Sequence, residues 1–241
     1  MIQTVKGMIK PCEMGYTMSH EHLCLDLSKV RKNDDSTYGY SNTVIKEIEK
    51  AKAYGVKTFV EVTCNDMGRD VQQLALLSEA CDIHIIAATG FYLDEYHPDF
   101  IDEASIEEIA EIFLQDLTVG IDNTGIRAGV IGEVASSESM TKNEYKILQA
   151  SALAAKKAGC AIVTHCQLGK LGNEQADIFI EMGMNPQKVI LGHIDLSNDL
   201  EYMCHLLDLG FNIAFDTIGK TAYLDDERRA ENLKYLVDKG Y

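Results

Sequence analysis

The stretch Gly15-Tyr-Thr-Met-Ser-His-Glu-His-Leu23 ends an extended apolar run with two histidines that are two residues apart. Successive side chains of a β-strand point to opposite faces, so residues i and i+2 point the same way. We therefore expect His20 and His22 to aim both imidazoles at one point, with Glu21 on the other face. Imidazole is a common ligand of divalent transition metals. One core histidine and one exposed histidine would give the same pattern, and it is His165 and His193 at the ends of other predicted strands that favour a metal site.

The composition favours one large α/β domain over residues 1–241. The chain is 46% hydrophobic, which is ample for a single core, and its three prolines and evenly spread charge mark no boundary for a second domain. Its net charge of -16 repels nucleic acid and anionic membranes. Seven cysteines without a Cys-x-x-Cys pair are typical of reduced thiols. Without a signal-peptide pattern or a long apolar run, we expect a soluble cytoplasmic protein.

Short apolar runs alternate with longer amphipathic runs along the whole chain. Such alternation predicts a parallel sheet whose strands are joined by right-handed helical crossovers. A small β element is expected before them, over residues 1–9. The predicted strands are 16–23, 57–63, 83–89, 127–133, 161–165, 189–193 and 211–216, and the predicted helices are 41–54, 67–80, 105–119, 142–157, 173–182, 200–209 and 225–239.

Polar residues at the strand ends favour a (β/α)8 TIM barrel over a doubly wound open sheet. In a barrel the carboxyl ends of all strands converge on one mouth, whereas an open sheet offers one crevice. Only seven strands are found, so we expect strand 8 and helix 8 to be missing from a chain truncated at its C-terminus. The strand-end residues are His22, Asn65, Glu133, His165, His193 and Asp216.

Glu133 is the natural bridge between two metal ions at this mouth. A carboxylate after an apolar run costs several kcal/mol to bury unless it is paired or binds a metal, and its two oxygens can serve one ion each. His165 and His193 close the next two strands. Each residue alone is typical of a solvated or hydrogen-bonded strand end, but together with His-x-His they indicate a metal site. The other histidines lack this context, and we expect structural roles for His84 and His205 and a surface position for His97.

Five motifs in chain order carry a resemblance to a known family. The chain resembles the phosphotriesterase family of the amidohydrolase superfamily, in particular its phosphotriesterase homology protein branch. The resemblance implies a (β/α)8 barrel of the metal-dependent hydrolase type with a binuclear site. The motifs are Gly15-x-Thr-x-x-His-Glu-His-Leu23, Gly132-Glu133, Thr164-His165, Gly192-His193-x-Asp195 and Phe215-Asp-Thr-Ile-Gly-Lys220.

The resemblance also implies roles for individual residues. His20 and His22 match the ligands of the more buried ion, Glu133 the bridging ligand, and His165 and His193 the ligands of the more exposed ion. The family's remaining ligand, an aspartate on strand 8, has no position in this sequence. The two divalent ions are expected to be zinc, with manganese or cobalt as alternatives, because geometry and availability decide among them.

The substrate is expected to be a small molecule, hydrolysed by metal-activated hydroxide. The family implies a lactone or related ester, including a phosphorylated sugar lactone, with organophosphate triester hydrolysis as the alternative. A further alternative is a catalytically dead metal-binding protein, if the chain ends at Tyr241, and a homodimer is allowed. The residues expected around the substrate are Tyr92, Asp216 and Lys220, and Asp195 is expected to continue a proton relay or to orient His193.

Overall fold

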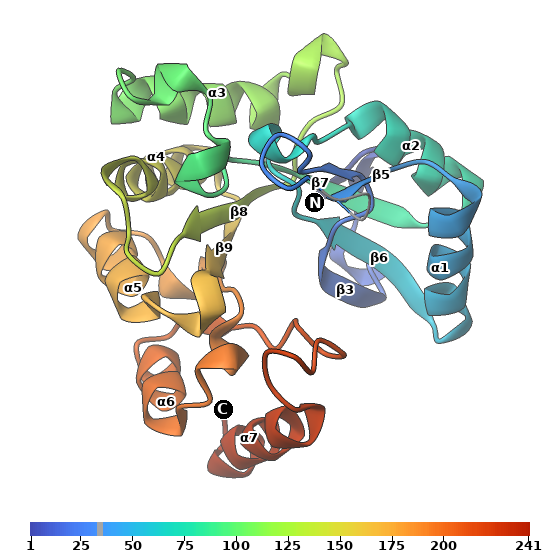
Figure 1. Ribbon diagram of the computed structural model, residues 1–241. Coiled ribbons are helices and arrows are strands. Elements are labelled where there is room, and N and C mark those ends of the chain that lie inside the picture. The colour runs from blue at the N-terminus through green and yellow to red at the C-terminus, as the bar shows by residue number, and fades with distance from the viewer. Residues whose placement is uncertain (33–35) are drawn as a thin grey trace.

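The computed structural model describes residues 1–32 and 36–241 and is built around a curled parallel sheet of seven strands (Figure 1). Every pairing within this sheet is parallel, and its spatial order is β11-β10-β9-β8-β7-β6-β3. The strands therefore follow one another in chain order, as in a barrel. Their bounds are β3 Tyr16–Glu21, β6 Val56–Glu61, β7 His84–Thr89, β8 Val130–Ser136, β9 Ala161–Cys166, β10 Val189–Leu191 and β11 Asn212–Ile213.

Seven helices cover the outer face of the sheet (Figure 1). Six of them begin within one residue of the predicted position, but α2 begins at Val71 instead of residue 67. The reason is local, because the left-handed Gly68 ends a 3-10 turn and the Asp70 side chain then caps the helix by accepting from two backbone N–H groups. The bounds are α1 Asn42–Ala53, α2 Val71–Ala80, α3 Ile106–Thr118, α4 Lys142–Ala158, α5 Gly172–Glu181, α6 Leu200–Asp208 and α7 Asp226–Lys239.

Two small antiparallel pairs lie outside the main sheet. The predicted β element at residues 1–9 is confirmed as the hairpin β1 (Ile2–Thr4) and β2 (Gly7–Ile9). It contacts β7 and adds the hydrogen bond from Val5 N to Ile85 O. The pair β4 (Leu25–Asp26) and β5 (Thr37–Tyr38) was not predicted, because two-residue strands leave no periodic pattern.

The sheet curls as a TIM-type barrel does, but it is a half-barrel in the described chain. Among residues 1–32 and 36–241, no backbone pairing joins the edge strands β3 and β11. The helices α1 and α7 stand at the two ends of the arc (Figure 1). The carboxyl ends of the edge strands still meet, since His20 Nδ1 lies 3.1 Å from Asp216 Oδ2.

The main core fills the space between sheet and helices with apolar side chains. Ile131 on β8, Phe113 on α3 and Phe179 on α5 are fully buried in one continuous cluster. Burying such a side chain contributes about 1.5–3 kcal/mol. No helix in the described parts of the chain has the length and apolar character needed to cross a membrane. The core thus fixes the helices on the outer face and leaves the strand ends free to carry polar groups.

Candidate metal centre

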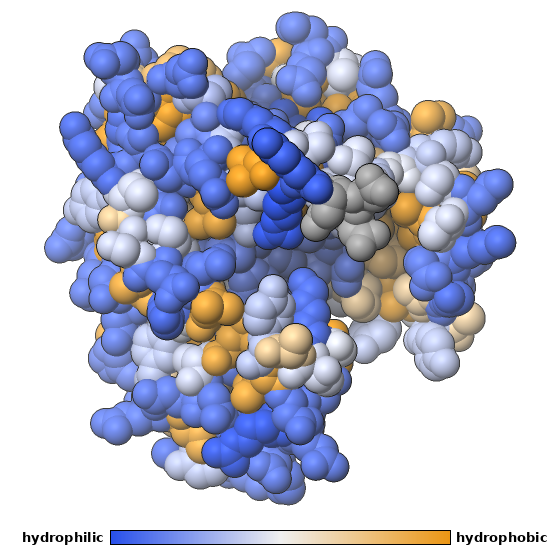
Figure 2. Space-filling model, in the orientation of Figure 1, coloured by the Kyte–Doolittle hydropathy of each residue, from blue (hydrophilic) through white to orange (hydrophobic). Residues whose placement is uncertain are grey.

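A cavity of about 520 Å³ opens at the carboxyl ends of the strands. The space-filling view shows a hollow at the centre of this face, surrounded mainly by hydrophilic residues (Figure 2). Eight of the nine predicted site residues line the cavity, although they come from strand ends and loops spread over 200 residues of sequence. They are His20, His22, Tyr92, Glu133, His165, His193, Asp216 and Lys220.

The Glu133 carboxylate lies at the centre of four imidazoles. Its Oε2 is 3.1 Å from His20 Nε2, 3.2 Å from His165 Nδ1 and 3.5 Å from His193 Nε2. Its Oε1 is 3.3 Å from His22 Nε2. The two oxygens therefore face different histidines, which is the arrangement that a ligand shared by two ions requires.

Local backbone geometry delivers two of these side chains. Gly132 has a φ of +145°, and a Cβ atom there would lie 2.4 Å from Val163 O, so only glycine lets β8 approach β9 closely enough to place Glu133. His193 itself adopts the left-handed conformation, with φ +60° and ψ 16°. Holding a non-glycine residue there costs about 1–3 kcal/mol. This strained conformation directs the His193 imidazole into the cavity.

Hydrogen bonds hold the outward nitrogens of three imidazoles. His22 Nδ1 lies 3.0 Å from Thr63 Oγ1, His165 Nε2 lies 2.7 Å from Gln167 Oε1, and His193 Nδ1 lies 2.7 Å from Asp216 Oδ1. An amide or carboxylate oxygen can only accept, so Gln167 and Asp216 assign the proton to the outward nitrogen of their partners. The inward nitrogens are then the ones left to bind a metal, which they do once they have released any proton.

The donor set fits divalent cations. His165 Nδ1 lies 3.0 Å from His193 Nε2, so the two inward nitrogens converge, and a cation bound by both would replace the proton between them. His20 Nδ1 and Asp216 Oδ2 are buried 3.1 Å from each other, without the geometry of a good hydrogen bond. Nitrogen and carboxylate ligands together suit zinc, manganese or cobalt. Ligand atoms within 4.8 Å of one another occur in three sets, His20 with His22 and Glu133, Glu133 with His165 and His193, and His20 with His193 and Asp216.

In the metal-free protein, the carboxylates keep two of these histidines protonated. Burial is the largest single influence on His20 and lowers its pKa, but Glu133 and Asp216 together outweigh it and raise the pKa to about 10. Burial likewise lowers the pKa of His193, and the same two carboxylates raise it to about 9. Burial raises the pKa of Glu133, yet His20 and His165 hold it well below its usual value. Protons therefore occupy positions that divalent cations would take.

We expect the metal-free protein to lose stability at alkaline pH. His20 and His193 have higher pKa values in the folded state than the 6.5 of an ordinary histidine, so their protonation stabilises the fold. This contribution to the free energy of unfolding is complete below pH 6.5 and is lost as the pH rises through about 9 and 10. Thermal unfolding with a chelator present should show a lower Tm at about pH 10.5 than at about pH 7.5. The double variant His20→Gln with His193→Gln should show a smaller drop, and His205→Gln should keep the full one. An equal drop in all three proteins would contradict the pKa assignment.

Asp195 is the predicted site residue that the structure does not bring into the cavity. Its Oδ2 accepts from Arg229 Nε at 2.9 Å and from Thr217 Oγ1 at 3.1 Å. Within the described residues it makes no hydrogen bond to His193, and Asp216 occupies the orienting position that was expected for Asp195. Asp195 was expected there as part of the motif Gly192-His193-x-Asp195, but the left-handed turn at His193 directs the next residues away.

Two further expectations need correction. Glu21 lines the same cavity as its neighbours, because the pairing of β3 with β6 changes register between Met18 and Glu21 and the strict alternation of faces is lost. His97 is buried and not on the surface, with Nε2 lying 3.0 Å from Tyr92 O. This hydrogen bond therefore holds the loop that carries Tyr92 in place.

The structure also places residues at the cavity that sequence reasoning missed. Gln167 holds His165, and its position two residues after a strand-end histidine is the only sequence signal for it. Arg31 adds a cation to the lining from a loop without periodic pattern.

Two of the predicted substrate residues lie at different depths of the cavity. Tyr92 has its hydroxyl 3.5 Å from His165 Nδ1, and Lys220 lies at the exposed rim.

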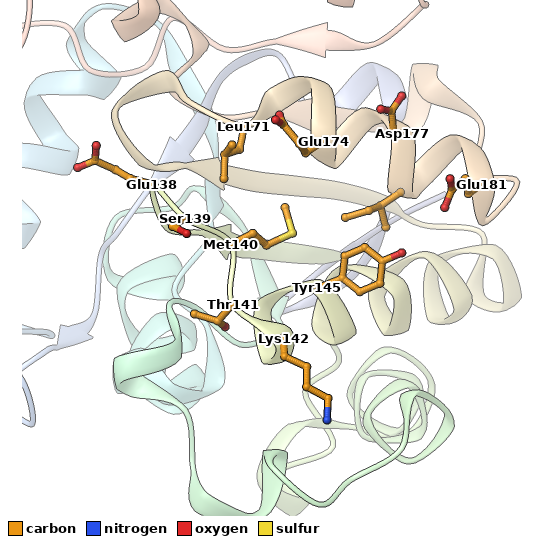
Figure 3. Close-up of a pocket in the computed structure, with 11 residues that line it drawn as sticks. Glu138, Ser139, Met140, Thr141, Lys142, Tyr145, Leu171, Glu174, Asp177 and Glu181 are labelled. Carbon is orange, nitrogen blue, oxygen red and sulfur yellow. The ribbon is translucent and has the colours of Figure 1, made fainter.

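A second cavity, of about 590 Å³, lies between α4 and α5 (Figure 3). It shares no lining residue with the first. Met140, Tyr145 and Ile178 form its apolar part, while Glu174 and Glu181 are among the carboxylates around it. None of the predicted ligands lines it.

Comparisons with known proteins agree with this geometry. A family model described as the phosphotriesterase family matches residues 1–241. The phosphotriesterase homology protein of Escherichia coli is 35% identical over 227 residues, covering 94% of this chain and 78% of that protein. Its crystal structure, complexed with phosphate in the active site, superposes with a TM-score of 0.92 over 95% of this chain and 79% of that one.

Two hydrolases are also similar. An aryldialkylphosphatase of Saccharolobus solfataricus is 31% identical over 243 residues, covering 98% of this chain and 76% of that protein. A lactonase of Listeria monocytogenes shares the fold, with a TM-score of 0.91 at 24% identity over 100% of this chain and 79% of that one. The family model, the sequence relatives and the fold agree over nearly the whole chain, and the chain belongs to the phosphotriesterase family of hydrolases.

Proposed function

We propose that the protein is a hydrolase that holds two divalent metal ions and cleaves a lactone or related ester. The observation that carries the proposal is the Glu133 carboxylate, whose two oxygens face four imidazoles with their inward nitrogens available. Zinc is the first candidate, with manganese and cobalt as alternatives. When bound, such ions lower the pKa of water to roughly 7 and polarise an acyl or phosphoryl oxygen.

The residues of this chain supply binding and orientation. His20 and His22 would hold one ion, His165 and His193 the other, and Glu133 both. Asp216 orients His193 through its 2.7 Å hydrogen bond. A cavity of about 520 Å³ falls in the range of small-molecule sites, which is roughly 300–1,000 Å³.

The cations at the cavity favour a substrate with an anionic group away from the bond that is cleaved. Lys220 and Arg31 both line the cavity, and neither lies among the proposed ligands. An ammonium or guanidinium group forms strong charge-assisted hydrogen bonds with phosphate. The phosphate in the active site of the Escherichia coli relative supports the same substrate class. We therefore place a phosphorylated sugar lactone first among the substrates.

Organophosphate triester hydrolysis is the second candidate. It needs the same ions and the same ligands, and the 31% identity to an aryldialkylphosphatase favours it. A fold alone does not fix a substrate, so rates must separate the two. The test compares kcat/KM of the metal-loaded protein for a phosphorylated sugar lactone, its unphosphorylated counterpart and an aryl dialkyl phosphate. We expect the phosphorylated lactone to be fastest; a triester that exceeds both lactones would reverse the order of the two candidates.

Lys220→Ala is expected to lower kcat/KM for the phosphorylated lactone by roughly ten- to a hundredfold, since one charge-assisted contact is worth about 1.5–3 kcal/mol. Hydrolysis of the unphosphorylated lactone should change little, because the proposed ligands are untouched. The matched control is Lys170→Ala, which removes a lysine that pairs with Glu138 outside the cavity. Equal losses on both lactones would assign Lys220 to the fold and not to the phosphate.

A further inference from the structure

His22 is the most exposed of the four proposed imidazole ligands. Its side chain is 22% exposed, whereas those of His20, His165 and His193 are 6%, 10% and 11% exposed. An imidazole at such a position keeps its orientation only if its second nitrogen is held. The group next to that nitrogen is Thr63 Oγ1, at 3.0 Å, from the residues that follow β6.

Thr63 is held in turn by a carboxylate that takes no other part in the site. Glu61, at the end of β6, is fully buried, and its Oε1 accepts from Thr63 Oγ1 at 2.6 Å. The same oxygen lies 3.1 Å from Leu23 N and 3.4 Å from Cys24 N, and Oε2 lies 3.3 Å from Thr63 N. The carboxylate thus binds both its own strand and the two residues directly after His22.

The directions of these hydrogen bonds follow from their partners. Backbone N–H groups can only donate, so Glu61 acts as an acceptor toward Leu23 and Cys24. In the 2.6 Å contact, the Thr63 hydroxyl donates its hydrogen bond to Glu61 Oε1. Thr63 Oγ1 then has only lone pairs to offer, and His22 must carry its proton on Nδ1. His22 Nε2 is then the nitrogen that faces Glu133, 3.3 Å from Oε1, and that is left to bind a metal ion.

We infer that Glu61 and Thr63 are positioning residues, which fix the ring orientation and the tautomer of His22 so that its Nε2 is presented to a metal ion. Nothing in the proposed function uses them, and the ladder between β3 and β6 ends just before them, with Val62 N donating to Glu21 O at 2.9 Å. The inference rests on the proposed metal site for its consequence, but the tautomer of His22 is a property of the metal-free chain.

The test replaces the hydroxyl and keeps the shape, with Thr63→Val, and restores the hydroxyl with Thr63→Ser. The matched control is Thr58→Val, near the start of β6, which removes a buried hydroxyl that donates to Met14 O at 2.6 Å, far from His22 in the sheet register. All proteins are prepared as the full chain without metal. The tautomer of His22 is measured by ¹⁵N NMR, and the affinity for Co²⁺ by titration of its absorption spectrum.

We expect the wild type, Thr63→Ser and Thr58→Val to hold the Nδ1–H tautomer of His22, and Thr63→Val to shift it toward Nε2–H. The first Co²⁺ affinity should fall by roughly 10- to 100-fold in Thr63→Val, the usual effect of losing an outer hydrogen bond to a metal-binding histidine, and stay nearly unchanged in Thr63→Ser and Thr58→Val. Thr63→Ala, which is smaller, provides the same readouts if the valine variant does not fold.

An unchanged tautomer in Thr63→Val and Thr63→Ala would overturn the inference, as would an equal loss of Co²⁺ affinity in Thr58→Val. If the wild-type protein bound no Co²⁺ but Thr63→Val still showed the expected tautomer shift relative to it, the proposed metal site would be wrong and the positioning of His22 by Thr63 would stand. The two proposals therefore fail in different ways.

Discussion

Replacing Glu133 by glutamine is expected to abolish the binuclear state and to lower kcat/KM on the order of 10³-fold or more, since it removes the one ligand shared by both ions. An amide has one good acceptor oxygen and no charge, so it cannot serve two cations. Four imidazole nitrogens lie within 3.5 Å of this carboxylate, and each would lose its ionic partner. The measurement is metal content by mass spectrometry together with kcat/KM.

The matched control for this change is Glu144→Gln. Glu144 is also fully buried, but it accepts hydrogen bonds from Ser137 and Thr141 at the start of α4 and is not among the cavity residues. Its replacement should lower the Tm and leave the metal content unchanged. A Glu133→Gln protein that retained two ions and full activity would refute the bridging role.

The double variant His20→Ala with His22→Ala is expected to reduce the bound metal to about half and activity by on the order of 10²-fold or more, because the ion at the end of β3 loses both imidazoles. His165 and His193 remain beside Glu133, so the second position keeps three ligands. The measurement is the number of ions per chain after dialysis against a weak chelator. His205→Ala, on α6 and outside the cavity, is the control. Full metal occupancy in the double variant would refute the ligand assignment at β3.

The sequence predicted the elements well because the chain alternates its periodicity cleanly. All seven predicted strands are present, in the predicted order, and the strand-end residues His22, Glu133, His165 and His193 meet as expected. This follows from topology alone, since the ends of parallel strands that are adjacent in the sheet converge when the sheet curls. The eight-stranded closure is not part of the described chain, which forms a half-barrel.

Local backbone irregularities account for most of what the sequence did not predict. The register change in β3 brings Glu21 into the cavity, and the left-handed His193 turns Asp195 toward Arg229 instead of the site. Neither departure has a signal in hydrophobic periodicity, which reports which face is buried but not where a strand bends.

The hydrogen bonds that hold the imidazoles from outside were missed for a different reason. Glu61 and Thr63 are two residues apart in the predicted strand 57–63 and so lie on one face of it. Two polar residues on one face of a buried strand indicate a buried hydrogen-bond network, but they do not indicate which histidine it holds. Gln167 and Asp216 contact histidines that are distant in sequence or separated by a turn, so only the folded chain reveals the pairing. Hydrogen-bond partners of ligands are therefore harder to predict than the ligands.

The most direct test of the account is a titration of the metal-free protein with Zn²⁺, Mn²⁺ and Co²⁺ that follows ion binding and lactone hydrolysis together. We expect two divalent ions per chain for at least one of these metals and hydrolysis that appears with the second ion, because Glu133 Oε1 faces His22 while Oε2 faces His20, His165 and His193. Saturation at a single ion with full activity would contradict the binuclear site. Two bound ions without hydrolysis of any ester or phosphotriester would contradict the proposed function and identify a metal-binding protein.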